Sequence, residues 1–218
     1  MDIKLLKGIN LFESLEEDEL LAVSRHLVHR HYPKNSVIIN EGDTTNSLYI
    51  ILSGQVKVYL NDENGKEVIL NVVKEGDYFG EVSLFDDGLH SASIMTLEQS
   101  QFAVLEKSAF LTCIASQPEL ALTIIKGLTL RLRGLSGAVR NLALMDVYGR
   151  VAHTLLELAT EVDGIKLISQ SLTYEDLAKR VGASSKMVGR VMKDLKTGGY
   201  ITKSGKKLII NQSLPSAW

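Results

Sequence analysis

LTYEDLAKRVGASSKMVGRVMKDLKTGGYITKSGKKLII, residues 172–210, decides the fold of the C-terminal part of this chain. Thr173 stands at a helix N-cap with Asp176 three residues later, a capping box with Asp in place of the usual Glu or Gln. Gly182 ends this helix, and Ser184 can cap a second one. Two short helices joined by a glycine-containing turn predict a helix-turn-helix motif.

The second helix of this motif has two distinct faces when it is drawn with 3.6 residues per turn. The apolar stripe consists of Val188, Val191, Met192 and Leu195. The opposite face consists of Ser185, Lys186, Gly189, Arg190 and Lys193. A short basic and polar face near a helix N-terminus is where a recognition helix presents side chains to base edges in the major groove.

Arg190 is the residue that we expect to read a base, because a guanidinium group can bond O6 and N7 of guanine together. Gly189 would let the helix approach the duplex closely. Ser185, Lys186 and Lys193 are as well suited to holding phosphates as to reading bases.

Residues 200–210 predict a β-hairpin with a basic tip, the wing of a winged helix. Each lysine alone would be read as a solvated surface charge, so the prediction depends on helix, turn, helix and wing following one another in order. The predicted DNA contacts are Ser184, Ser185, Lys186, Gly189, Arg190, Lys193 and Lys206.

Composition places the chain among ordinary globular proteins, with 218 residues, 45% hydrophobic and 23% charged. No apolar run approaches the roughly 20 residues of a membrane span, and the N-terminus lacks the layout of a signal peptide, so we expect a cytoplasmic protein. Cys113 is the single cysteine, which excludes an intrachain disulfide, a Cys-rich zinc site and a cysteine-held iron-sulfur cluster within one chain.

The charge is divided unevenly along the chain. Residues 146–218 hold 11 Lys and Arg against 7 Asp and Glu, a net charge of +4, whereas residues 1–145 hold 13 against 19, a net charge of −6. A basic C-terminal part on an acidic protein is consistent with nucleic-acid binding, although a solvated basic face would look the same.

Residues from about Val37 to Glu106 are rich in short strand-like runs separated by turn residues. Glycines recur at positions 42, 54, 65 and 76, and Asn64-Gly65 is a strong hairpin signal. The pattern predicts an antiparallel roll or barrel of short strands, preceded by a short helix around residues 16–26.

From Pro118 to about Thr160 the pattern becomes helical. Apolar residues fall on heptad positions at Ala121, Ile124, Leu128, Leu135, Ala138, Leu142 and Met145, with Arg131 as the interruption. The stripe is long enough for a parallel dimer seam, which we favour, but a helix packed on its own domain gives the same pattern. Glycines 127, 134 and 137 each lower helix propensity by roughly 1 kcal/mol and would permit close approach of a partner helix or a ligand.

Taken together, these features closely resemble the family of the cyclic-AMP receptor protein and the fumarate-nitrate regulator. The residues that carry the resemblance are Glu41-Gly42-Asp43, residues 48–54, Phe79-Gly80-Glu81, residues 141–147 and Val188-Gly189-Arg190. It implies an α+β chain with an N-terminal antiparallel β-roll effector domain (1–116), a central dimerisation helix (117–145) and a C-terminal winged helix-turn-helix (146–218). It also implies a homodimer that binds a near-palindromic promoter site and contacts RNA polymerase.

The family's phosphate cassette has a counterpart in Gly80, Glu81, Val82 and Ser83. In the family, backbone N–H groups of this segment cradle a cyclic phosphate and the carboxylate accepts the ribose 2′-OH; unpaired amides and a carboxylate suit these roles. The remaining effector positions implied by the resemblance are His90, Ser91, Leu135 and Ser136.

Four positions depart from the family pattern. His90 stands where the cassette has an arginine, in a segment one residue shorter than usual, and a neutral imidazole offers one donor where arginine offers a charged fork. Leu135 replaces the threonine of the Thr-Ser pair that meets adenine, and Ser185-Lys186 replaces Arg-Glu on the recognition helix. We therefore expect an altered operator.

The departures leave three possibilities for the effector. These are a weakened or altered site for a cyclic nucleotide such as cyclic AMP, a site for another ligand such as cyclic di-GMP, and no small ligand, with the roll kept as a scaffold.

Other classes of function have less support. The chain lacks a nucleophile elbow, a P-loop and a dinucleotide fingerprint, so we expect no catalytic residues. His26, His29 and His31 near Arg30 predict a solvated basic surface, which the family sometimes uses to touch polymerase, rather than a metal site. A cyclic-nucleotide-binding module that acts on protein partners is the alternative function, and the winged helix argues against it.

Overall fold

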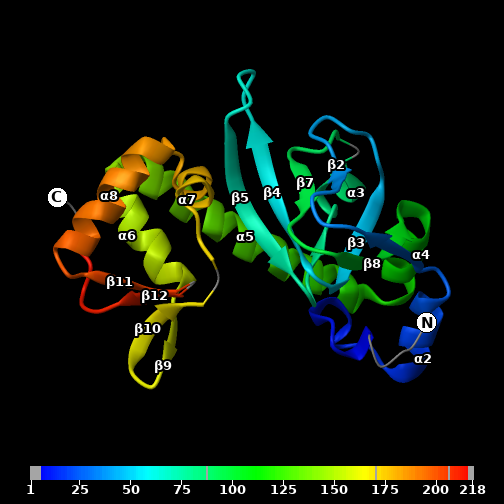
Figure 1. The fold of residues 1–218 in the computed structure, drawn as a ribbon. Helices are drawn as coiled ribbons and strands as arrows, with labels where there is room; N and C mark the ends of the chain where they lie inside the picture. Colours follow the sequence, from blue (N-terminus) through cyan, green and yellow to red (C-terminus); the bar gives the residue numbers. More distant parts are fainter. Residues whose placement is uncertain (1–5, 87, 170, 206, 216–218) are drawn as a thin grey trace. The chain divides into compact units, whose positions relative to one another are not determined.

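The computed structural model describes residues 6–86, 88–169, 171–205 and 207–215 (Figure 1). Its contacts divide the chain into two compact units, Met1–Arg133 and Gly134–Trp218. The division falls inside the long helix α5 (Pro118–Leu144), whereas the domain boundaries expected from the sequence were set at the ends of that helix.

The first unit is a β-roll made of two four-stranded antiparallel sheets. One sheet has the order β1 (Val28–Tyr32), β8 (Ser100–Glu106), β3 (Ser47–Ser53) and β6 (Tyr78–Phe79). The other has the order β2 (Val37–Ile39), β7 (Ser93–Thr96), β4 (Gln55–Asn61) and β5 (Glu67–Lys74). This confirms the predicted roll.

Turn chemistry explains where these strands end. Gly42, Gly54, Gly65 and Gly76 all have positive φ, between 76° and 89°, a region that glycine enters without steric cost. Gly54 also lies so close to Ser100 that a Cβ would collide with it. The hairpin around Asn64-Gly65 is confirmed, with a connection of residues 62–66 between β4 and β5.

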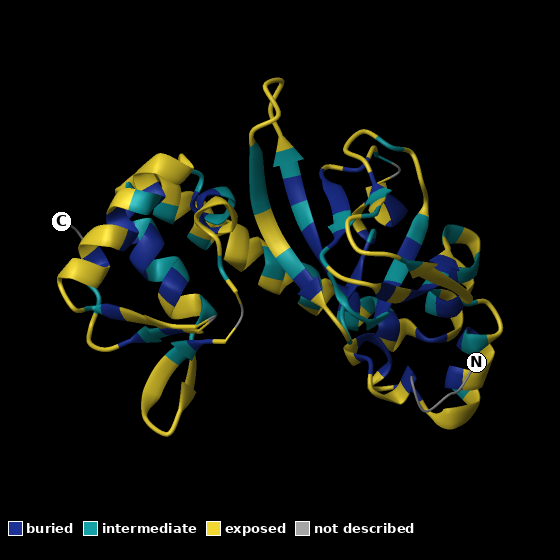
Figure 2. Cartoon of the chain, in the orientation of Figure 1, coloured by how far each residue is buried: buried dark blue, intermediate teal, exposed yellow. Residues whose placement is uncertain are grey.

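Two apolar clusters hold the roll together. The cluster between the sheets contains Ile39, Ile51, Val56, Val73, Phe79, Ile94 and Phe102. The cluster on the other face of the β1-β8-β3-β6 sheet joins its strands to the helices η1 (Asn10–Phe12), α2 (Glu17–Ser24), α4 (Lys107–Ser116) and α5. Figure 2 shows buried residues both on the strands of the roll and on the helices that pack beside them.

The apolar stripe of helix α5 packs on its own unit in the N-terminal half of the helix and is exposed, as a dimer seam would be, in the C-terminal half. Ile124 is fully buried and Leu128 packs against the same cluster, so the N-terminal half packs on its own unit. Leu135, Val139 and Leu142 are 47%, 65% and 52% exposed, so the other half is open to a partner. Arg131 turns toward the roll.

The second unit is a winged helix. Helices α6 (Val147–Leu158), α7 (Tyr174–Val181) and α8 (Ser185–Thr197) share a buried cluster with a sheet of order β11 (Ile201–Ser204), β12 (Lys207–Ile210), β10 (Ile165–Ile168) and β9 (Thr160–Val162). The helix-turn-helix and the wing are confirmed. Two strands, β9 and β10, lie outside the strands expected from the sequence.

Among the described residues, no single helix is long and apolar enough to cross a membrane. Helices α4 and α5 meet that test only as a pair, which is bent by 113°.

Candidate functional site

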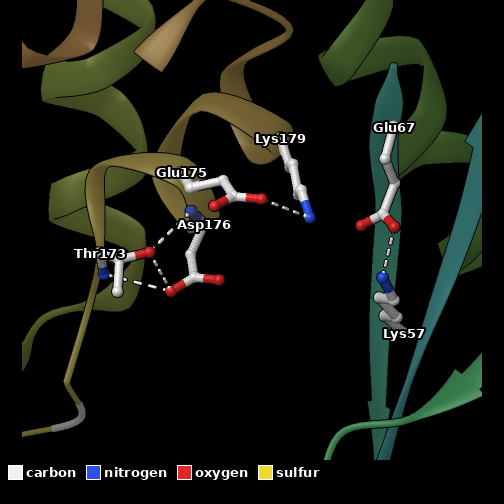
Figure 3. Close-up of polar contacts among 6 residues, drawn as sticks. All are labelled: Lys57, Glu67, Thr173, Glu175, Asp176 and Lys179. Atoms are coloured by element: carbon white, nitrogen blue, oxygen red, sulfur yellow. Dashed lines mark hydrogen bonds and ion pairs between the residues drawn. The ribbon is translucent and has the colours of Figure 1, made fainter. Parts of the chain in front are cut away.

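Local capping fixes both helices of the helix-turn-helix. The Thr173 hydroxyl accepts a hydrogen bond from the Asp176 N–H at 3.0 Å, and Asp176 Oδ2 accepts one from the Thr173 N–H at 3.1 Å, so the predicted capping box is present (Figure 3). Gly182 ends α7 in the left-handed region at φ 65°. Ser184 Oγ then accepts from the Met187 N–H at 3.3 Å and starts α8.

Burial of one face of α8 determines which side chains point outward. Val188, Val191, Met192 and Leu195 are at most 5% exposed, as the apolar stripe predicts. Because the stripe is anchored, the opposite face is presented to solvent. Exposed on α8 and at its N-cap are Ser184, Ser185, Lys186, Arg190 and Lys193.

The three cations of this face, Lys186, Arg190 and Lys193, form a row at i, i+4 and i+7, which places them on one side of the helix. Within the described part of the chain, none of their side chains forms an ion pair or a hydrogen bond. By contrast, Lys179 on α7 is paired with Glu175 at 3.1 Å (Figure 3). We call Lys186, Arg190 and Lys193 the basic row.

Two other predicted contacts lie differently. Gly189 is half-buried, and the space that a Cβ would occupy lies 3.6 Å from the ring of Tyr174, so Gly189 faces α7. The ring of Tyr174 also lies 5.8 Å from the Lys196 ammonium. Lys206 lies outside the described residues, and its neighbour Lys207 is exposed on β12.

Arg150 has a structural role that the sequence did not predict. Its Nε donates to the Val181 carbonyl and its Nη1 to the Met145 carbonyl, both at 2.9 Å. These bonds tie α6 to the end of α7, immediately before the turn that leads into α8. A single arginine in a helix gives no sequence signal for such a role.

The cassette of the first unit lies between β6 and the short helix α3 (Val82–Asp86). Gly80 has φ 85°, and a Cβ there would lie 2.6 Å from the Ser47 carbonyl oxygen, so this position accepts no side chain. Glu81 and Ser83 are 2% and 1% exposed. Ser83 Oγ is within hydrogen-bond distance of two carbonyl oxygens, that of Gly80 at 3.2 Å and that of Thr45, outside the cassette, at 3.3 Å. Val82 is exposed.

Arg131 of α5 is paired with Glu81. Its Nη1 forms an ion pair with Glu81 Oε1, and its Nη2 donates to the Tyr78 carbonyl at 2.5 Å. The guanidinium also lies 4.8 Å from the centre of the Tyr78 ring. In the sequence Arg131 is an interruption of the heptad, and a charged residue within an apolar stripe is the signal that points to such a pair.

Tyr78 fits against α5 at Gly127, where a Cβ would collide with the Tyr78 hydroxyl. Burial raises the pKa of Tyr78 to about 12, although the positive charge of Arg131 opposes the shift. The hydroxyl has no hydrogen-bond partner among the described residues. The group that approaches Gly127 closely is thus a tyrosine of the same chain, and not the partner helix or the ligand that the glycine pattern suggested.

His90 is buried and turned toward Thr45. Its Nε2 lies 2.7 Å from the Thr45 carbonyl oxygen and 2.9 Å from Thr45 Oγ1, the geometry of an Nε2–H that donates to the carbonyl. Ser91 is exposed. Leu135 and Ser136 are exposed on the part of α5 that belongs to the second unit, and their role toward an effector stays a prediction.

A β-roll with a phosphate-type cassette, followed by a winged helix with an exposed basic row, defines the class of effector-domain transcription regulators. Residues 29–117 match the cyclic nucleotide-binding domain, and residues 149–213 match the Crp-like helix-turn-helix domain.

The chain is similar over nearly its whole length to curated transcription regulators. It is 31% identical over 214 residues, 96% of both chains, to the CRP-like cAMP-activated global transcriptional regulator of Mycobacterium tuberculosis. It is 35% identical over 190 residues, 84% of this chain and 89% of the other, to the cAMP-activated global transcriptional regulator CRP of Pasteurella multocida.

The fold is also that of solved regulators. The c-di-GMP responsive global regulator CLP of Xanthomonas campestris has a TM-score of 0.79 at 24% identity, covering 90% of this chain and all of that one. This protein belongs to the CRP/FNR family of DNA-binding transcription regulators.

Proposed function

We propose that this protein binds promoter DNA as a homodimer, with α8 of each subunit in a major groove of a near-palindromic site. The observation that carries the proposal is the basic row, three exposed cations held on one side of α8 by a buried apolar stripe. Arg190 reads a base, preferably guanine. Lys186, Lys193 and the hydroxyls of Ser184 and Ser185 hold phosphates or reach neighbouring bases.

Selection of binding sites from a random duplex library tests this proposal. We expect two inverted half-sites whose centres lie about one helical turn, 10 to 10.5 base pairs, or a multiple of it apart. Arg190→Lys should relax the preference at one base pair in each half-site, because lysine cannot reproduce a bidentate fork. Selection of a single unsymmetrical site, or of no site, would contradict the proposal.

The dimer is proposed to form along α5. Ile125, Leu132 and Val139 are 56%, 65% and 65% exposed and seven residues apart, and Leu135 and Leu142 interleave with them. One row of this seam, positions 125, 132 and 139, lies one residue later than the expected heptad row at 124, 131 and 138, because Ile124 is buried. Sedimentation of Val139→Glu should show a monomer or a much weaker dimer, whereas Arg140→Glu, beside it on the helix, should sediment as the wild type.

For the effector, we propose a cyclic nucleotide bound at the cassette with lower affinity than a cassette with arginine at position 90 would give. The match of residues 29–117 to the cyclic nucleotide-binding domain supports the class of ligand. Glu81 supplies an acceptor for a ribose hydroxyl, and Arg131, 28% exposed, places a cation beside it. His90 points to Thr45 and has no free Nε2 for a phosphate.

Calorimetry with cyclic AMP, cyclic GMP and cyclic di-GMP identifies the nucleotide. His90→Arg should raise the affinity for the ligand that binds, because arginine adds a charged fork for the phosphate. If none of the three nucleotides binds at millimolar concentration, the proposal fails.

A second candidate is a cassette that holds no small ligand. It is favoured by the same pairs, Glu81 with Arg131 and His90 with Thr45, which already satisfy the groups that a ligand would use. This candidate predicts that the selected operator binds equally well with and without each nucleotide.

The remaining assignments are proposals drawn from the family. The protein acts in the cytoplasm without an enzymatic activity and contacts RNA polymerase. Transcription from the selected operator with purified polymerase tests the last of these, since a regulator that recruits or blocks polymerase changes the yield of transcript.

A further inference from the structure

The β1-β8-β3 part of the roll contains a hollow of about 540 Å³ that no function above uses. Among its lining residues are Arg30, Tyr32, Ser47, Tyr49, Val104 and Glu106. This volume lies in the range of about 300 to 1,000 Å³ that is typical of small-molecule sites.

The strand register explains why these side chains meet. Val104 of β8 pairs with both Val28 of β1 and Tyr49 of β3, and Ser47 pairs with Glu106. Paired residues in adjacent strands point to the same face of a sheet. Three strands therefore contribute to one surface, which lies on the same face as Phe102 and the cluster between the sheets.

Aromatic rings form the apolar part of the hollow. Phe102 lies 5.5 Å from the ring of Tyr32 and 6.4 Å from the ring of Tyr49, edge-on in the latter case. Tyr49 is stacked on Phe79 at 4.9 Å. Rings locked in this way lose little conformational entropy when a flat ligand packs against them.

Arg30 supplies an uncommitted cation to this surface. Its register partner is Phe102, and its side chain forms no ion pair or hydrogen bond with the residues that the structure describes. Burial and nearby Tyr32 raise the pKa of Tyr49, and the charge of Arg30 acts in the opposite direction, so the three groups lie within electrostatic reach. Tyr49 keeps its proton and is a hydrogen-bond donor at neutral pH.

Glu106 places a carboxylate at the other end of the hollow. It lies four residues along β8 from Phe102, the register partner of Arg30, which is about 13 Å at a rise of 3.3 Å per residue. Arg30 and Glu106 both line the hollow from these two positions. A ligand that satisfies both ends carries an anion at one end, a flat apolar body and a hydrogen-bond donor at the other.

We propose that this hollow binds an aromatic carboxylate whose ring carries an amino or hydroxyl group at the end opposite the carboxylate. Arg30 pairs with the carboxylate, the rings of Tyr32 and Tyr49 pack against the aromatic body, and Glu106 accepts from the donor group. The cassette borders the hollow, because the space of a Cβ at Gly80 is 3.3 Å from the ring of Tyr49, which lines it. A bound molecule would therefore press on the residue that supports the cassette.

Calorimetry of the full chain with 4-aminocinnamate as the probe tests the proposal. A ligand of this size in a partly open site should bind with a dissociation constant of about 1 mM or below. Arg30→Gln should weaken binding about tenfold, the usual effect of losing one charge-assisted hydrogen bond. His29→Gln changes the neighbouring residue on the opposite face of β1 and should leave the affinity unchanged.

Two further probes separate the ends of the site. Cinnamate lacks the donor for Glu106, and 4-aminocinnamamide lacks the charge for Arg30, so both should bind more weakly than the probe. Equal affinities of wild type and Arg30→Gln, with both proteins folded by circular dichroism, would overturn the proposal. So would the absence of binding at about 10 mM probe.

Discussion

The structure predicts a large loss of stability when the Arg131 guanidinium is removed and Glu81 is retained. The carboxylate of Glu81 is 3% exposed and its partner Arg131 is 28% exposed. Arg131→Met keeps most of the side-chain volume but leaves a buried charge without its cation. Loss of one partner from a buried pair costs about 3 to 5 kcal/mol, and the partial exposure of Arg131 reduces this to about 2 to 4 kcal/mol.

The assay is urea unfolding followed by circular dichroism, with the free energy of unfolding as the measured quantity. Arg131→Lys retains the charge but loses the two-point contact, so it should lie between wild type and Arg131→Met. In the double variant with Glu81→Gln, much of the loss should be recovered because no buried charge remains. A loss below about 0.5 kcal/mol in Arg131→Met would refute the reasoning, since it would place the pair among solvent-exposed ones.

Two further predictions concern the contact between Tyr78 and α5. Gly127→Ala should destabilise the fold by about 1 to 3 kcal/mol in urea unfolding, because its Cβ would collide with the Tyr78 hydroxyl. Gly134→Ala is the control, since its Cβ meets open space and should stabilise the helix by about 1 kcal/mol. Equal effects of the two substitutions would contradict this prediction. The folded-state pKa of Tyr78, about 12, lies above the usual 10. The contribution of the neutral Tyr78 side chain to stability is therefore fully present below pH 10 and is lost as pH rises toward 12. Over that range the free energy of unfolding should fall by about 1.4 kcal/mol per pH unit more in wild type than in Tyr78→Phe; parallel pH profiles would disprove it.

Much of the fold could be predicted because the caps and turns that end its helices and strands depend on neighbouring residues in the sequence. Thr173, Gly182 and Ser184 act through neighbours within a few residues, so their roles could be inferred from the sequence and are present in the structure. The glycines at strand ends, such as Gly54 and Gly76, work in the same way. Strand β9 was missed because its three residues, Thr160–Val162, are all exposed and too few to show an alternating pattern.

The contacts of the cassette could not be predicted from the sequence, because they join residues that are far apart along the chain. Whether His90 faces a ligand or Thr45 depends on a contact across 45 positions of the chain, and the Arg131 to Glu81 pair spans 50. A heptad pattern likewise does not say whether Ile124 packs on its own unit or on a partner helix, since both surfaces are apolar. Long-range packing decides these questions.

The central claim, that the basic row of α8 reads duplex DNA, is tested most directly by fluorescence anisotropy with the selected operator over a range of salt concentrations. Arg190→Ala should lose about 1 to 3 kcal/mol of binding free energy on the operator and show less discrimination against a substituted base pair. Lys166→Ala, an exposed lysine of β10 outside the basic row, should bind as the wild type does. Equal operator affinities of wild type and Arg190→Ala at each salt concentration would contradict the claim.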